Sequence, residues 1–149
     1  MITAWRLVSQ ARAATAFSGE GSYRYGNRWN HRGTRVVYLA ATTSLAALEV
    51  LVHAGSPDHL IPFEAFRVSF PESMVSQLEK IPDDWRGSPA PESTKGVGSA
   101  WVQSGRSAVL QAPSVVVPWE FNYVVSVEHP DYVHVKIAEP VPFRFDARL

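Results

Sequence analysis

The alternation of apolar and polar side chains predicts a chain built of short strands. Residues 2–8 and 63–70 alternate with period two, which indicates strands with one buried face. Residues 36–40 form an apolar run of strand length. Shorter runs predict further strands at 108–111, 119–126, 133–137 and 141–145. We therefore expect about six or seven strands.

Residues 44–54 carry a helical period instead. Leu45, Leu48 and Val52 recur at helical spacing and predict an apolar stripe that packs on the sheet, with Glu49 beside it. Thr43 is a suitable N-cap residue, and the glycine and proline after residue 54 are a stop signal. Weaker patterns predict short helices at 10–16 and 93–104.

Two stretches lack a clear period. Residues 18–22 are a glycine-rich loop, and residues 23–35 mix aromatic side chains, arginines and asparagines, which indicates a long ordered loop. Residues 71–91 are rich in proline, aspartate and serine, and we expect a surface excursion there. With two or three helices among the strands, the pattern predicts an α+β fold in one domain.

Composition narrows the class of protein. The chain has 149 residues, 46% of them hydrophobic, which suffices for one domain with a real core. A net charge of +0 argues against bulk attraction to nucleic acid or membrane. The absence of cysteine excludes disulfides and thiol catalysis, and the five histidines show no paired ligand spacing, so we expect no metal site. Without a signal-peptide pattern or a spanning apolar run, we expect a cytoplasmic protein.

The charge is unevenly spread along the chain. Residues 1–36 hold one acid, Glu20, against six basic residues, all of them arginines: Arg6, Arg12, Arg24, Arg28, Arg32 and Arg35. Arginine is the side chain best suited to forked contacts with phosphate. A solvated basic surface is the simpler interpretation for most of the six.

The candidate chemistry lies between residues 26 and 49. Arg28 stands among glycine and asparagine residues, Tyr38 lies inside an apolar strand, and Glu49 lies inside an otherwise apolar helix. Together these side chains could bind a phosphorylated, aromatic, ribosylated ligand. Taken singly, each has an ordinary alternative: a surface arginine, a core aromatic residue and a solvated helix residue.

Three stretches carry a resemblance to a known family. They are Gly-Asn-Arg-Trp-Asn at 26–30, Tyr-Leu-Ala-Ala-Thr-Thr-Ser-Leu-Ala-Ala-Leu-Glu at 38–49 and Pro-Ser-Val-Val-Val-Pro at 113–118. In order and spacing the chain resembles a RES-domain toxin of the RES–Xre type II toxin–antitoxin systems, over nearly its whole length including 121–123. The resemblance implies one RES domain over 1–149 and an ADP-ribosyltransferase-like fold with a split or two-part sheet.

The same resemblance implies roles for individual residues. Arg28, Glu49 and Ser114 match the arginine, glutamate and serine for which the family is named, and Tyr38 matches a tyrosine important in it. These four are the implied catalytic residues. Arg6, a weaker match, joins Arg28, Tyr38 and Ser114 as implied NAD-binding residues. The segment around Ser126 departs from the family pattern, which leaves the role of that serine open.

The implied activity is the degradation of NAD, as a substrate, by cleavage of its nicotinamide–ribose bond. That cleavage creates an oxocarbenium-like sugar, which a carboxylate such as Glu49 can stabilise. Water, phosphate or a protein side chain could accept the ADP-ribose, and a non-catalytic binding module or corepressor is the alternative from another class.

The implied partner is an Xre-type helix-turn-helix antitoxin that covers the active site. The resemblance further implies a homodimer within that complex, and DNA contact only through the antitoxin.

Overall fold

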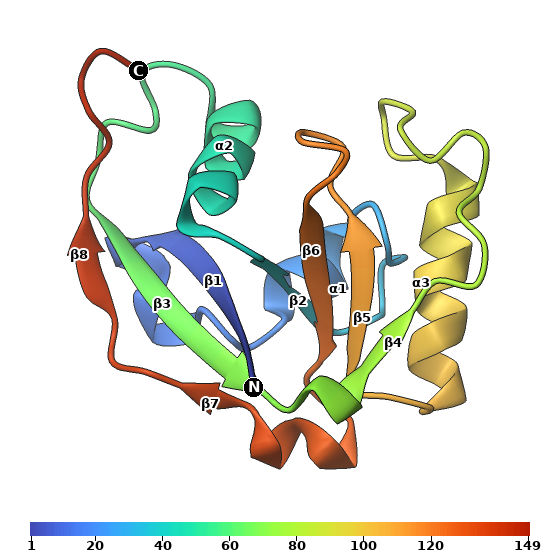
Figure 1. Ribbon diagram of the computed structural model, residues 1–149. Coiled ribbons are helices and arrows are strands. Elements are labelled where there is room, and N and C mark those ends of the chain that lie inside the picture. Colours follow the sequence, from blue (N-terminus) through green and yellow to red (C-terminus); the bar gives the residue numbers. More distant parts are fainter.

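Eight strands form one curled sheet in the computed structural model, which describes residues 1–149 (Figure 1). The sheet order is β4-β5-β6-β2-β1-β3-β7, with β8 also paired to β3, and only β4 and β5 run parallel. The strands are β1 Ile2–Ser9, β2 Val36–Ala40, β3 Phe63–Phe70, β4 Val75–Gln77, β5 Val109–Pro113, β6 Phe121–Ser126, β7 Lys136–Ile137 and β8 Val141–Phe143.

Three α-helices and three short 3-10 helices connect the strands. The α-helices are α1 Glu20–Tyr25, α2 Thr43–Ala54 and α3 Glu92–Ser104, and the 3-10 helices are Gln10–Thr15, Glu72–Met74 and Pro130–His134. In Figure 1, α2 stands above the sheet and α3 lies beside β4 and β5. The α+β class expected from the sequence is confirmed.

The sheet has two parts that meet between β1 and β2. These two strands pair at a single position, Trp5 with Ala40. By contrast, β1 pairs with β3 along its whole length, and β2 pairs with β6 along its whole length. The expected two-part sheet is therefore confirmed, as one continuous sheet with a weak join.

The side chains of β2 alternate between the two faces of the sheet and so contribute to two different hydrophobic clusters. Val37 and Leu39 point into the larger core cluster, which includes Phe66 and Phe70 of β3 and β6 side chains. Val36 points to the opposite face, in a second cluster formed under α3 by Trp29, Trp101, Leu110, Ala112 and Val124. This second face is the one that carries the candidate site.

Helix α3 approaches the segment around residue 29 closely. A Cβ atom built at Gly98 would lie 1.6 Å from the carbonyl oxygen of Trp29. Only glycine permits that distance, because any side chain at position 98 would overlap main-chain atoms. Glycine at position 98 is thus what allows α3 to pack against this segment.

The apolar stripe expected on α2 is wrong. Leu45 is 1% exposed, but Leu48 is 41% and Val52 63% exposed. The helix is capped by Thr42, whose Oγ1 accepts a hydrogen bond from the main-chain N of Leu45 at 3.0 Å. Its buried residues, Leu45 and Ala46, both lie near that end, because α2 touches the sheet with its first turns and then projects away from it.

Three other expectations need correction. Residues 20–25 form α1 rather than loop, and β4 lies within the stretch expected to be a surface excursion, where it gains hydrogen bonds from β5. Residues 133–137 are mostly not a strand. Pro130 starts a 3-10 helix that runs to His134, and the side chain of His129 caps it by accepting from the main-chain N of Asp131 at 3.0 Å.

Candidate functional site

Small side chains on the sheet make room for Glu49. Asn122 on β6 has Ala40 of β2 and Ala112 of β5 as its direct neighbours on the two sides. Side chains opposite one another in a sheet point to the same face. The methyl groups of the two alanines leave space beside Asn122, and the side chain of Glu49 enters it from α2.

The carboxylate of Glu49 is held by two side chains. Its Oε1 accepts hydrogen bonds from Ser114 Oγ and from Asn122 Nδ2, each at 3.0 Å. Its Oε2 makes no hydrogen bond and lies 4.0 Å from Nε2 of His53. The Glu49 side chain is 26% exposed, so the carboxylate remains accessible from solvent.

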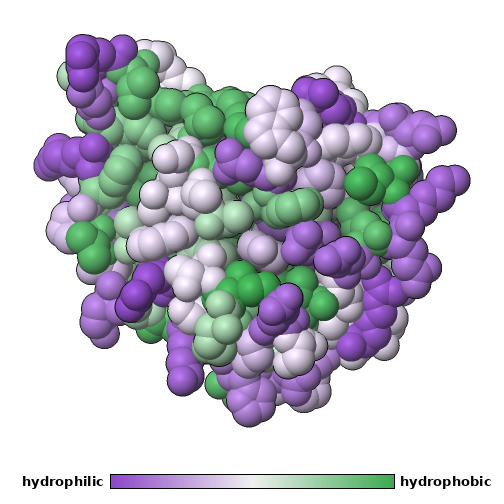
Figure 2. Space-filling model, viewed as in Figure 1, coloured by the Kyte–Doolittle hydropathy of each residue, from purple (hydrophilic) through white to green (hydrophobic).

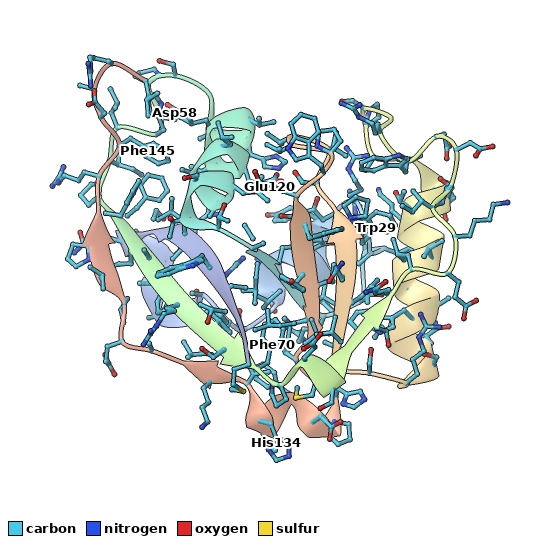
Figure 3. The ribbon with its side chains drawn as sticks, viewed as in Figure 1. Trp29, Asp58, Phe70, Glu120, His134 and Phe145 are labelled. Carbon is cyan, nitrogen blue, oxygen red and sulfur yellow. The ribbon has the colours of Figure 1, made fainter.

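Ser114 is fully buried at the start of the loop between β5 and β6. Its Oγ accepts from the main-chain N atoms of Val116 and Val117, at 3.0 and 3.2 Å. With its lone pairs engaged there, the hydroxyl hydrogen is directed to Glu49. A second tie joins this loop to α2, because Thr42 Oγ1 donates to Glu120 Oε1 at 3.3 Å. Figure 3 shows Glu120 between the loop and the helix.

Arg28 lies at the tip of a tight turn. Asn27 and Asn30 close this turn with two main-chain hydrogen bonds of 3.0 and 3.2 Å. Arg28 Nη1 donates to the carbonyl oxygens of Trp85 and Gly87, both at 2.8 Å, while Nε and Nη2 make no hydrogen bond. Burial lowers the pKa of Arg28, and attraction to the Glu49 carboxylate partly opposes that shift.

Tyr38, on the neighbouring strand β2, holds the turn at residues 27–30 in position through hydrogen bonds. Its hydroxyl donates to Asn30 Oδ1 at 2.7 Å and accepts from the main-chain N of Trp29 at 3.1 Å. Burial raises the pKa of Tyr38, so the hydroxyl keeps its proton and remains a donor. Asn30 is itself fully buried, and its Nδ2 donates to the carbonyl oxygens of Ser22, His31 and Thr34.

Arg6 lies apart from Arg28, Glu49 and Ser114, on the opposite face of the sheet, and touches only the main chain of Tyr38. It shares a face of β1 with Ala4, which belongs to the larger core cluster. Its Nε donates to the Ala16 carbonyl at 2.7 Å and its Nη1 to the Tyr38 carbonyl at 3.0 Å, at the join of the two parts of the sheet. Burial without an acidic partner lowers its pKa to about 10. It makes no hydrogen bond with Arg28, Glu49 or Ser114, and its role toward a ligand stays a prediction.

No role for Asn122, Asn30 or residues 85–87 was expected from the sequence. Asn122 occurs in the Phe-Asn-Tyr stretch of the resemblance, but an asparagine in a strand carries no chemical signal by itself. Only the strand register brings it to Glu49. Ser126, whose role was open, is buried on β6, and its main-chain N donates to the Ala108 carbonyl at 2.9 Å.

Nowhere do three or more side chains of histidine, aspartate or glutamate gather as a metal ion requires. None of the helices combines the length and the apolar character that crossing a membrane demands.

Known proteins resemble this chain along its whole length. A "Toxin Res" of Yersinia enterocolitica is 37% identical over 148 residues, covering 97% of each chain. A "Toxin Res" of Photorhabdus laumondii is 32% identical, covering 97% of this chain and 95% of its own. A "Prs ADP-ribosylating toxin" of a Sphingobium species is 33% identical over 152 residues, covering 97% and 94%.

A solved structure shares the fold. The crystal structure of the M. tuberculosis MbcT–MbcA toxin–antitoxin complex contains a chain that superposes with a TM-score of 0.75 at 17% identity, over 95% of this chain and 84% of that one. Residues 3–146 match the family described as the RES domain. The chain therefore belongs to the RES-domain family of toxins.

Proposed function

We propose that this toxin degrades NAD by cleaving the bond between nicotinamide and ribose. The observation that carries the proposal is the Glu49 carboxylate, which is held through Oε1 while Oε2 makes no hydrogen bond. A half-buried carboxylate prepared in this way can face a positive charge that develops on a sugar. Its interaction with Arg28 supports a site that accepts both a cationic ribose and an anionic diphosphate.

In the proposed reaction the bond between ribose C1′ and the nicotinamide nitrogen breaks, and its electron pair leaves with neutral nicotinamide. Positive charge spreads over C1′ and the ring oxygen, where the Glu49 carboxylate stabilises it. A water oxygen then bonds to C1′ and loses a proton to solvent. The products are nicotinamide, ADP-ribose and one proton.

The other residues would hold the substrate or the carboxylate. Arg28 has Nε and Nη2 available for a forked contact with the diphosphate. The half-buried ring of Tyr38 would lie along the nicotinamide, while its hydroxyl keeps the Arg28 turn in position. Ser114 would act mainly through Glu49, because its hydroxyl hydrogen is directed to that carboxylate. Arg6 would add positive charge at the join of the sheet.

Transfer of ADP-ribose to a protein is the second candidate, because a relative of similar length is named "Prs ADP-ribosylating toxin". The bond that breaks is the same, and a protein side chain takes the place of water. Phosphorolysis would differ only in using phosphate as the acceptor.

The proposed partner is an Xre-type helix-turn-helix antitoxin that covers the site in the cytoplasm. A solved protein of the same fold is titled as a toxin–antitoxin complex, which supports an antitoxin partner. We further propose a homodimer of the toxin within the complex, and DNA contact through the antitoxin alone, since the toxin has a net charge of +0.

Incubation of the purified protein with NAD, followed by chromatography, tests the proposal. Nicotinamide and ADP-ribose in equal amounts support hydrolysis, and ADP-ribose phosphate formed only in phosphate buffer supports phosphorolysis. Label retained on a protein from NAD labelled in the adenylate part supports transfer. Unchanged NAD over hours at micromolar protein would reject all three and leave a binding module.

A further inference from the structure

We infer that Asn122 is a positioning residue that makes the two oxygens of Glu49 unequal, with Oε1 fixed to the protein and Oε2 presented to the substrate. This inference rests on the proposed cleavage of NAD. Its basis is the pair of 3.0 Å hydrogen bonds that Asn122 Nδ2 and Ser114 Oγ donate to the same oxygen of one carboxylate.

Packing alone does not fix the orientation of Glu49. Leu48, one position before it, and Val52, three positions after it, are 41% and 63% exposed, while Val50 and Leu51 are half-buried. Helix α2 is buried only through Leu45 and Ala46, one turn earlier. A glutamate on such a helix would sample several rotamers, so the two hydrogen bonds from the sheet side select one of them.

Asn122 is the more decisive of the two donors. A serine hydroxyl can rotate to donate or to accept a hydrogen bond. The amide of asparagine can contact an ionised carboxylate only through its NH₂ group, which always donates. The Asn122 side chain projects from β6, a strand paired on both sides. Its neighbours Ala40 and Ala112 are 4% and 0% exposed, so the Asn122 amide projects from a closely packed part of the sheet that holds it in position.

Charged groups face Glu49 from few directions. His53 on the same helix lies 4.0 Å from Oε2, and Arg28 interacts from the turn at 27–30. The β6 and β5–β6 loop side chains that touch the carboxylate, Asn122 and Ser114, are both neutral. A carboxyl group placed at position 122 would therefore be the one acidic group against Oε1.

Two variants test the assignment. Asn122→Ala should lower kcat about 10- to 100-fold with KM for NAD changed less than about threefold, because the lost contact orients a catalytic group instead of binding substrate. Asn122→Asp cannot donate while ionised and repels Glu49, but it donates its O–H to Oε1 once protonated. Its kcat should recover as the pH is lowered, so its pH profile is displaced toward acid relative to wild type.

The matched control is Gln111→Ala on the adjacent strand β5. Gln111 is also a half-buried amide, but it points to the opposite face and makes no side-chain hydrogen bond, so kcat should be unchanged. Wild-type kcat in Asn122→Ala, or an Asn122→Asp profile that is lowered equally at every pH, would overturn the inference. If Asn122→Ala fails to fold, as judged by thermal melting, Asn122→Ser keeps a donor and should restore both folding and part of kcat.

Failure of the proposed function would be seen separately, as wild-type protein that leaves NAD intact. In that case crystal structures of wild type and Asn122→Ala decide the inference, since the expected loss of the Glu49 rotamer requires no activity. A Glu49 side chain that stays on Ser114 in the same position would overturn it.

Discussion

At the scale of single residues, glutamine can replace Glu49 with little change in shape. The side-chain oxygen of glutamine can still accept from Ser114 and Asn122, so Glu49→Gln should fold normally. It removes the negative charge that the proposed transition state needs. We expect kcat for NAD cleavage to fall on the order of 10²–10³-fold, as after loss of one preorganised electrostatic contact.

Affinity separates that role from simple binding. NAD binding by Glu49→Gln, measured by calorimetry on the sample used for turnover, should change much less than kcat. Glu64→Gln is the control, since Glu64 is half-buried on β3 and its side chain makes no hydrogen bond. An equal loss of binding and turnover would mean that Glu49 holds substrate, and no loss of either would make it a solvated helix residue.

Arg28 gives a second prediction at this scale. Arg28→Ala should abolish measurable NAD cleavage, because each charge-assisted hydrogen bond to a diphosphate contributes roughly 1.5–3 kcal/mol. Arg28→Lys should rescue poorly, since lysine lacks the fork. Arg32→Ala, at an exposed arginine of the same loop without a side-chain hydrogen bond, should keep wild-type activity. Turnover at the wild-type rate by folded Arg28→Ala would exclude the role.

The family resemblance indicated four residues of the candidate site but gave no role to Asn122, and this difference has a physical cause. Tyr38 holds the Arg28 turn through Trp29 and Asn30, and Ser114 donates to Glu49, in two separate networks on the same face of the sheet. Asn122 could not be found, because its role depends on the strands that pair beside it. Strand register is a tertiary property, and a single sequence does not specify it.

At the scale of elements, α3 decides where the Arg28 turn can lie. Gly98→Ala would bring a methyl group onto the Trp29 carbonyl, so either the helix or residues 27–30 must move. We expect a loss of about 1–3 kcal/mol in the free energy of unfolding, as for an overpacked core, together with reduced NAD cleavage. Denaturant unfolding and turnover measure the two effects.

Gly96→Ala is the matched control in the same helix, because nothing lies within 4 Å of a Cβ built there. That change should stabilise the protein by up to about 1 kcal/mol through helix propensity. Equal stability of the two alanine variants would show that the close approach of α3 to Trp29 does not affect the free energy of unfolding.

Helix α1 is tied to the chain before β2 by Glu20, which accepts from Arg35 at 2.9 Å and from Arg24 at 2.7 Å. Hydrogen bonds from Arg35 and then Arg24 lower the pKa of Glu20 below its ordinary value of 4.5. The stabilisation is therefore present above pH 4.5 and is lost as the pH falls through the lowered value. Urea unfolding should give a small difference between wild type and Glu20→Gln at pH 7 that shrinks progressively as the pH is lowered below 4.5. A difference that persists unchanged at acid pH would contradict this assignment.

The sequence predicted elements well where one face of the element is buried, and poorly where contacts with distant segments determine whether the element forms or packs. The alternation of β1 and β3 follows directly from their shared core face. The predicted packing of the α2 stripe was wrong because a helical period indicates which face of a helix is apolar, but not which of its turns contact the sheet. Strand β4 was missed because only three residues pair, and their partner β5 lies more than thirty positions away.

At the scale of the whole molecule, the site lies where several separate segments meet. Helix α2, strand β6 and the loop after β5 supply Glu49, Asn122 and Ser114, and residues 85 and 87 accept hydrogen bonds from Arg28 in the turn at 27–30. None of these segments would keep the arrangement alone. The toxin should therefore lose activity in the same transition in which it loses its tertiary structure.

The exposed face of α2 leads to the last prediction, which concerns the proposed antitoxin. Figure 2 shows hydrophobic atoms gathered over the region that α2 occupies in Figure 1. Leu48 and Val52 lie there on both sides of Glu49 in the helix, and Trp119 on the neighbouring loop is 81% exposed. Apolar side chains beside the carboxylate proposed to be catalytic suit a partner that must cover the site.

The double variant Leu48→Gln with Val52→Gln removes this apolar surface without changing charge near Glu49. Free toxin carrying it should cleave NAD at the wild-type rate, while its Kd for the antitoxin should rise at least about tenfold, a loss of roughly 1.4 kcal/mol. Val133→Gln, at a residue 79% exposed in the 3-10 helix 130–134, is the control and should leave that Kd unchanged. Cells that express antitoxin should then tolerate wild type and Val133→Gln but stop growing with the double variant. If the antitoxin binds and silences the double variant as tightly as wild type, it covers the site from another side, and the arginine-rich loop at 23–35 becomes the surface to change next.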